Sequence, residues 1–409
     1  MRLLGTPLWT LLSMLVYILY KQVGLSPLQI TCIVALKPTS SLLSPYWSHA
    51  IYKRPHRLIT NLFGANFLKY FFFLWLPWVD SVWLMIFAFG LYMTLSRAAI
   101  PAWTEVFQSN LPSEQRVQLV GYATTIDYLG TAIMSVLLGV ILDLYPDQWK
   151  WLFWISALLG ILSTTSLMLI RPYMSDSSKM PVCFSGRSTN KRLDTFYRFK
   201  KQIFRPWKTV SRLLLSRTDF TMFQWGFMLG GSALMIIQPA LPRFFMDTLK
   251  LSFVEMGCAI SFCKGLGVAL SSPVWTRLFR KVNIFQFSSL VTLFAAIFPF
   301  FLLASYWQAT LLYFAYGFYG VMQAGSEMSW HMSSLVFSKG RDSSLFSIAN
   351  VLTIGIRGCL VPILGSIFLY WLHPSGVIVL SAFLALGASI YFKHQSRYQS
   401  ARQESPSVS

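Results

Sequence analysis

The amino-acid sequence predicts an all-α polytopic membrane protein, with twelve transmembrane helices arranged as two pseudo-symmetric six-helix bundles. Three observations predict this fold class. Hydrophobic residues make up 55% of the 409 positions and charged residues only 12%, whereas soluble domains carry about 25% charged residues. Apolar runs long enough to cross a bilayer recur along the whole chain. The second half also repeats features of the first half in the same order.

Twelve apolar segments account for most of the chain. They cover residues 6–22, 26–44, 58–77, 81–107, 117–143, 149–171, 218–243, 253–272, 284–304, 308–337, 344–371 and 375–392. Because a helix of about 20 apolar residues spans the hydrocarbon core, each segment is expected to cross the membrane once. The first segment has no small-x-small cleavage site before Lys21, so we expect a retained helix and not a cleaved signal peptide.

Two pairs of similar stretches lie at nearly the same spacing. Ser44-Pro45-Tyr46-Trp47 recurs as Ser272-Pro273-Val274-Trp275, at the ends of the second and eighth segments. Phe89-Gly90-Leu91-Tyr92 recurs as Tyr316-Gly317-Phe318-Tyr319, in the fourth and tenth segments. This spacing predicts a duplicated six-helix unit in parallel orientation.

The repeat divides the chain into four parts. Residues 1–171 and 218–393 are the two predicted bundles. Residues 172–217 form a basic central loop, whose apolar residues from Phe196 onward step by three or four positions and predict an amphipathic helix. This helix would lie on the cytoplasmic leaflet or pack against neighbouring loops. Residues 394–409 are polar, and we expect a disordered cytoplasmic tail.

The positive charges are distributed unevenly between the two predicted sides of the membrane. Most of the 34 Lys and Arg residues fall on the side of both termini and the central loop. The positive-inside rule therefore places both termini in the cytoplasm, and we expect the cell (inner) membrane. Anionic lipid headgroups, not nucleic acid, are the expected partner of the net charge of +20. We expect a monomer without a cofactor. We also expect no metal site, because no His or Cys residues have the spacing of metal ligands.

Seven charged residues fall inside the predicted spans, where each costs ~3 kcal/mol or more near the bilayer centre. They are Lys37, Lys69, Arg97, Asp127, Lys264, Glu327 and Arg357. Five are positive and two are negative, so a bound anion would offset the excess. Lys37, Lys264, Arg357 and Arg97 are therefore candidate substrate-binding residues. For Lys37, Lys264 and Arg357 an alternative fits equally: a tie between helices, or a base that snorkels to the interface. For Arg97 the alternative is a charge pair with Glu105 of the same helix, near the interface. For Lys69, packing or snorkelling is the better interpretation.

Two acidic residues and one histidine are candidates for proton coupling. Glu327 and His331 are four residues apart, which places them on one face of a helix. A carboxylate and an imidazole can pass on a proton near neutral pH, and Asp127 is the other membrane carboxylate. The alternative for Glu327 and His331 is a polar cluster at the cytoplasmic end of the helix.

The stretch from Ser272 to Lys281 resembles the loop motif Gly-x-x-x-Asp-Arg-x-Gly-Arg-Lys of the major facilitator superfamily. It keeps the basic positions of the motif but has Thr276 in place of the Asp, and the first copy keeps little beyond Lys53. The resemblance implies alternating access, with helices 2 and 11 as neighbours and helices 5 and 8 as neighbours. That arrangement would bring Lys37 near Arg357, and Asp127 near Lys264. It also implies gating loops that contain Trp47, Lys53, Trp275, Arg277, Arg280 and Lys281.

The sequence thus predicts a secondary active transporter for a small anionic or zwitterionic solute, with symport of protons as the expected coupling. Two other functions stay open. One is a non-transporting sensor or scaffold of the same fold, which the altered motif allows. The other is a lipid-modifying membrane enzyme, which would need a reactive cluster at one interface. We do not expect an enzyme, because the chain has no Gly-x-Ser-x-Gly, phosphate loop or His-Glu-x-x-His motif.

Overall fold

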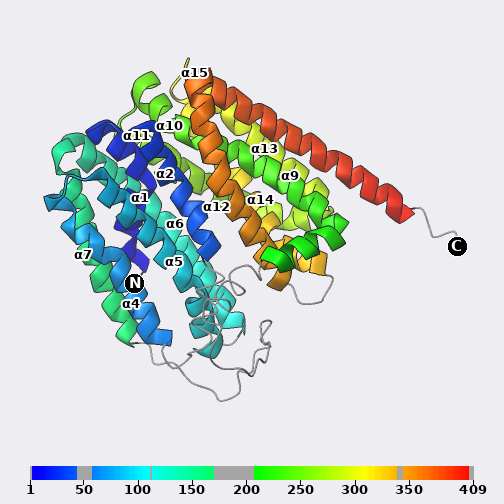
Figure 1. The fold of residues 1–409 in the computed structure, drawn as a ribbon, viewed down its shortest axis with the longest axis horizontal. Coiled ribbons are helices and arrows are strands. Elements are labelled where there is room, and N and C mark those ends of the chain that lie inside the picture. Colours follow the sequence, from blue (N-terminus) through cyan, green and yellow to red (C-terminus); the bar gives the residue numbers. More distant parts are fainter. Residues whose placement is uncertain (1, 44–57, 111–112, 170–206, 339–343, 405–409) are drawn as a thin grey trace, which may run out of the picture.

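The computed structural model describes residues 2–43, 58–110, 113–169, 207–338 and 344–404. In these residues the chain is helical and crosses the length of the molecule twelve times, six times in each half (Figure 1). The predicted fold class is therefore confirmed. The chain turns back at the positions where the apolar segments of the sequence end.

The amino-terminal half contains six spans. They are α1 (Arg2–Val23), α2 (Pro27–Thr39) with a 3-10 turn (Ser40–Leu43), α4 (Leu58–Phe71) with a 3-10 segment (Phe72–Trp78), α5 (Val82–Asn110), α6 (Ser113–Leu144), and α7 (Trp149–Thr165) with a 3-10 turn (Ser166–Leu169). A short 3-10 turn (Pro146–Gln148) joins α6 to α7.

The carboxy-terminal half repeats this pattern, with two spans built from several helical pieces. The spans are α9 (Thr218–Ile236) continued by η6 (Gln238–Ala240), α10 (Leu241–Arg243) and η7 (Phe244–Thr248); α11 (Phe253–Gly257) continued by η8 (Cys258–Cys263) and α12 (Lys264–Phe279); α13 (Ile284–Ala304); α14 (Leu311–Ser338); and the two arms of α15 (Ser344–Glu404). The segments η7 and η8 are π-helical, a geometry that often marks functional sites, and η8 ends one residue before Lys264.

Polar caps determine where several helices begin. Ser26 before α2 and Ser252 before α11 each form a capping box with the side chain three residues on, Gln29 and Glu255 respectively. Asn283 caps α13 through its side-chain oxygen, which accepts from the Gln286 N–H at 2.8 Å. These side chains satisfy N–H groups that have no partner within the helix.

The last helix corrects one prediction. The two arms of α15 meet at His373, which has φ 56° and ψ 170° and precedes Pro374, so the predicted break between the last two spans is confirmed. The second arm, however, stays helical to Glu404, whereas we expected disorder from residue 394 onward. The reason is local: residues 394–404 contain no Gly or Pro, and Gln, Arg, Ala and Glu are good helix formers.

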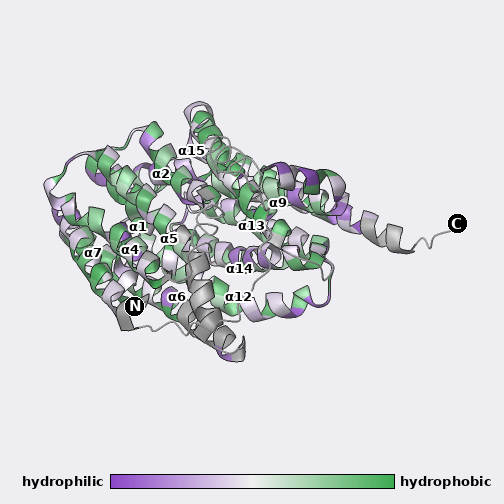
Figure 2. Ribbon diagram, turned by 60° about the horizontal axis from the view of Figure 1, so that its bottom comes forward, coloured by the Kyte–Doolittle hydropathy of each residue, from purple (hydrophilic) through white to green (hydrophobic). Residues whose placement is uncertain are grey.

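The outer faces of the helices are largely hydrophobic (Figure 2). Large apolar side chains such as Trp225, Leu270 and Phe383 are 66–75% exposed, as expected for a surface solvated by lipid. By length and composition, six helical stretches in the described residues could cross a membrane, and the last of them, Leu345–Tyr398, includes both arms of α15. The other spans are shorter, more polar or divided by 3-10 turns.

The two halves meet through close helix pairs, as the family resemblance implies. On one side α6 packs on α11, where Gly139 faces the backbone of Phe253 and Ser135 donates to the Gly257 carbonyl at 3.2 Å. On the other side α2 packs on α15, where Pro38 contacts Gly358. Helices 2 and 11, and helices 5 and 8, are therefore neighbours.

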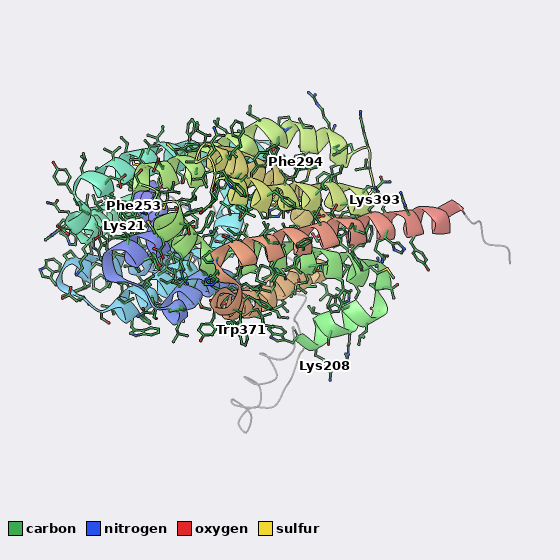
Figure 3. The ribbon with its side chains drawn as sticks, turned by 90° about the horizontal axis from the view of Figure 1, so that it is seen from above. Lys21, Lys208, Phe253, Phe294, Trp371 and Lys393 are labelled. Atoms are coloured by element: carbon green, nitrogen blue, oxygen red, sulfur yellow. The ribbon has the colours of Figure 1, made fainter. Side chains whose placement is uncertain are left out.

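One end of the molecule, opposite the amino terminus, is held closed by contacts between the halves. The Tyr20 hydroxyl lies 2.7 Å from an Asp247 oxygen, and Lys21 Nζ lies 4.5 Å from the centroid of the Phe253 ring (Figure 3). The Asp143 carboxylate of α6 accepts from two backbone N–H groups of α11, Phe253 at 2.9 Å and Val254 at 3.0 Å. An acidic side chain of one half thus caps a helix of the other half.

The described end of the central loop is a helix over residues 207–216. Its buried Val210 belongs to an apolar cluster with Phe220 and Phe285, whereas Lys208 and Arg212 are exposed. The apolar side of this part of the helix therefore packs on the protein. Residues 170–206, which hold the rest of the predicted helix, lie outside the described residues.

Candidate functional site

A cavity of about 420 Å³ lies between the two halves. Residues from α1, α2 and α5 line it on one side, and residues from α9, α12, α13, α14 and α15 line it on the other. Three of the predicted substrate-binding residues, Lys37, Lys264 and Arg357, are among the lining residues. No Asp or Glu of the described chain contributes to the lining. The wall of the cavity is therefore electropositive.

Lys37 and Lys264 face the cavity from opposite halves. The positive charges of Lys264 and Arg97 both act on the Lys37 ammonium group, and Lys37 Nζ lies 5.2 Å from the centroid of the Trp9 ring. In the described part of the chain neither lysine ammonium group donates a hydrogen bond to a protein acceptor. Two like charges thus share one cavity, and the Trp9 ring offers only a modest cation–π stabilisation to one of them.

Arg357 is held in place by α9. Its Nη1 donates to the Phe227 carbonyl at 2.7 Å, and its guanidinium carbon lies 5.3 Å from the centroid of the Phe227 ring. Gly231 makes this position possible, because a side chain there would overlap the guanidinium group. The residue is only 7% exposed, and its Nε is buried without an acceptor in the described residues. A fixed, partly unsatisfied guanidinium group is suited to bind an anionic oxygen.

The two acidic candidates, Asp127 and Glu327, are not among the residues that line the cavity. The carboxylate that acts on the Lys264 ammonium is Glu327, whereas we expected Asp127 in that role. Glu327 accepts from Gln323 at 3.0 Å and interacts with the Tyr128 hydroxyl across the two halves. The charge of Asp127 acts on Tyr128 and on Tyr92.

The remaining predicted site residues lie apart from the cavity. His331 is exposed and contacts the Trp330 ring at a centroid distance of 4.6 Å, and the described partners of Glu327 do not include it. Trp275 is buried inside the carboxy-terminal half and donates from Nε1 to the Val321 carbonyl at 2.8 Å, a packing role. Its neighbours Arg277, Arg280 and Lys281 are exposed at the end of α12. Trp47 and Lys53 lie outside the described residues.

Aromatic side chains complete the cavity wall, and our sequence reasoning did not assign them to the site. Trp9, Phe89, Tyr316 and Tyr319 all line the cavity. The repeat contained a signal for two of them, because Phe89 and Tyr316 occupy equivalent positions in the duplicated stretch. Trp9 carried no comparable signal, since a tryptophan in an apolar helix is equally typical of packing. The site therefore combines separated cations with flat apolar surfaces.

Solved transporter structures share this fold along nearly the whole chain. A POT family transporter in complex with 5-aminolevulinic acid superimposes with a TM-score of 0.71 at 12% identity, covering 97% of this chain and 96% of that chain. The nucleoside transporter NupG gives 0.70 at 12% identity and 96% of both chains, and a D-xylose-proton symporter gives 0.61 at 12% identity, 96% of this chain and 95% of that chain. At such identity the likeness concerns the fold alone. No curated protein matches the sequence.

The sequence itself matches a family over most of its length. The match to the Major Facilitator Superfamily extends over residues 3–356, which include Lys37 and Lys264 and end one residue before Arg357. Members of this family are secondary transporters and typically not enzymes. The match agrees with the twelve spans, the two similar halves and the cavity between them. The chain is thus a multi-pass membrane protein, and it belongs to the major facilitator superfamily.

Proposed function

We propose that this transporter moves a small anionic or zwitterionic solute by alternating access at the cavity between its halves. The observation that carries the proposal is the composition of the wall: three cations and, in the described chain, no carboxylate. Buried charges are unfavourable in a low-dielectric interior unless something of opposite sign compensates them. A bound anion supplies that compensation, and a cationic solute would add to the repulsion.

The arrangement of the halves supports alternating access. The contacts of Tyr20, Lys21 and Asp143 join the halves at one end of the molecule. Under the positive-inside rule, that end faces away from the cytoplasm and both termini lie inside. The described conformation would then be one that is closed to the outside, in a cell (inner) membrane. Rocking of the halves would open the other side.

Proton coupling is the second part of the proposal. Glu327 is next to the cavity, its charge acts on Lys264, and its contact with Tyr128 joins the two halves. Protonation of Glu327 would weaken both interactions, and this would link a proton to the affinity for the anion and to the movement of the halves. His331, being exposed and away from Glu327's described partners, is the weaker candidate.

Uptake into proteoliposomes tests this function. The purified full-length chain would be reconstituted and offered labelled amino acids, organic acids, phosphorylated sugars and nucleotides, with and without an inward proton gradient. Lys37→Ala should abolish accumulation, whereas Lys393→Ala, at an exposed position, should leave it unchanged. Accumulation of cations alone would refute the anion proposal. Absence of flux for every solute would favour a sensor or scaffold.

A further inference from the structure

The charge balance around the cavity narrows the class of solute, provided that the proposed transport of an anion holds. The wall carries three positive groups, and Glu327 offsets one of them by acting on Lys264. Lys37 experiences the further positive charges of Lys264 and Arg97, and no carboxylate of the described residues lines the cavity. The positive charges of Lys37 and Arg357 on the wall therefore remain uncompensated. A single carboxylate would leave one of them unpaired.

The positive groups form two separate binding points. Lys37 and Lys264 are the first, since the charge of Lys264 acts directly on Lys37 and neither ammonium group has a described hydrogen-bond partner. Arg357 is the second, because its described interactions are all with α9: the Phe227 carbonyl, the Phe227 ring and the space left by Gly231. One compact anionic group between the lysines would leave the guanidinium group of Arg357, which also lines the cavity, without an anionic partner.

The surface between these points is apolar and aromatic. Trp9, Phe89 and Tyr316 line the same cavity as the cations. A volume of about 420 Å³ falls within the ~300–1,000 Å³ usual for small organic ligands. We propose that the solute is an organic dianion, with one anionic group held by Lys37 and Lys264, a second held by Arg357, and an apolar or aromatic body between them.

Matched aromatic anions test this proposal on the purified full-length chain in nanodiscs. Terephthalate carries two carboxylates on one ring, benzoate carries one, phenyl phosphate carries a doubly charged phosphate, and benzylammonium is the cationic control. Calorimetry should give terephthalate at least a tenfold lower Kd than benzoate and a lower Kd than phenyl phosphate, because only terephthalate places one anionic group at each binding point. Tighter binding of phenyl phosphate would overturn the two-point arrangement.

Variants locate the two binding points. Arg357→Gln should reduce the affinity for terephthalate to that for benzoate and leave benzoate unchanged. Since the buried Arg357 could be needed for folding, Lys264→Gln is the second variant, and it should weaken every anion. Lys393→Gln, at an exposed position of the last helix, is the control. Equal affinity for benzoate and both dianions would refute the proposal that the solute is a dianion, while the proposal of anion transport would still stand. Binding of benzylammonium alone would instead refute the proposed function.

Discussion

The contact of Asp143 with α11 predicts how firmly one end of the transporter is closed. The Asp143 carboxylate joins the halves by accepting from two backbone N–H groups at 2.9 and 3.0 Å, at a helix terminus whose dipole favours negative charge. In Asp143→Asn the charge is lost, and the amide has only one acceptor oxygen for the two donors. The conformation in which this end is closed should therefore become less populated.

The expected size of the change follows from the geometry. A hydrogen bond to a charged group contributes about 1.5–3 kcal/mol when buried, and a charge at an exposed helix end about 0.3–1 kcal/mol. Asp143 is exposed, although one of its two bonds is partly buried. We therefore expect the substitution to change the free-energy difference between the closed and open conformations by about 1.4 kcal/mol. This corresponds to a tenfold change in the ratio of closed to open molecules.

Distances between spin labels measure this ratio. With the native cysteines replaced by alanine, labels at Ser81→Cys and Gln308→Cys would report the separation of the halves at the closed end. Asp143→Asn should move a substantial fraction of molecules to the longer distance. The control is Asp147→Asn, which removes an exposed acid that lies four residues further on and has no described partner. If both variants give the same distance distribution as the parent, Asp143 does not hold the halves together.

Three further variants test other contacts of the structure. Gly320→Ala should lower the Tm by several degrees, because its methyl group would meet the carbonyl of Lys264, whereas Gly317→Ala on the same helix meets nothing within 4 Å and should not lower it. Asn350→Leu should lower the free energy of unfolding by about 2 kcal/mol, since the buried Gln224 and Ser333 lose the hydrogen bonds that they form with the Asn350 side chain. An unchanged midpoint of chemical unfolding would contradict this. Glu327→Gln should abolish the stimulation of uptake by a proton gradient, while exchange of labelled solute continues. If the stimulation is preserved, Glu327 is not part of the coupling mechanism.

The parts of the structure that follow from hydropathy could be predicted from the sequence. Twelve spans and the break near Pro374 agree with the prediction, because bilayer thickness and backbone hydrogen bonding leave few alternatives. The neighbouring helix pairs also agree, but that expectation came from the family resemblance. Contacts between the halves could not be predicted in the same way. In the sequence, Asp143 is only an acidic residue near the end of an apolar segment. The fold shows that the first residues of α11 lie beside it. The partner of Lys264 was likewise mistaken, because two helices adjacent to α12 each offered one carboxylate.

The repeat explains why two lysines meet in one cavity, and also why Arg357 matters. Equivalent residues of parallel repeats face each other across an axis along the membrane normal, so Lys37 and Lys264 from equivalent positions converge at the centre, as do Phe89 and Tyr316. A site built only from such pairs would bind a solute equally well in two orientations. Arg357 has no charged counterpart, since the equivalent position in the first half is Gly130, which packs against Thr6. The single guanidinium group therefore breaks the symmetry of the wall and would orient a bound dianion in one direction.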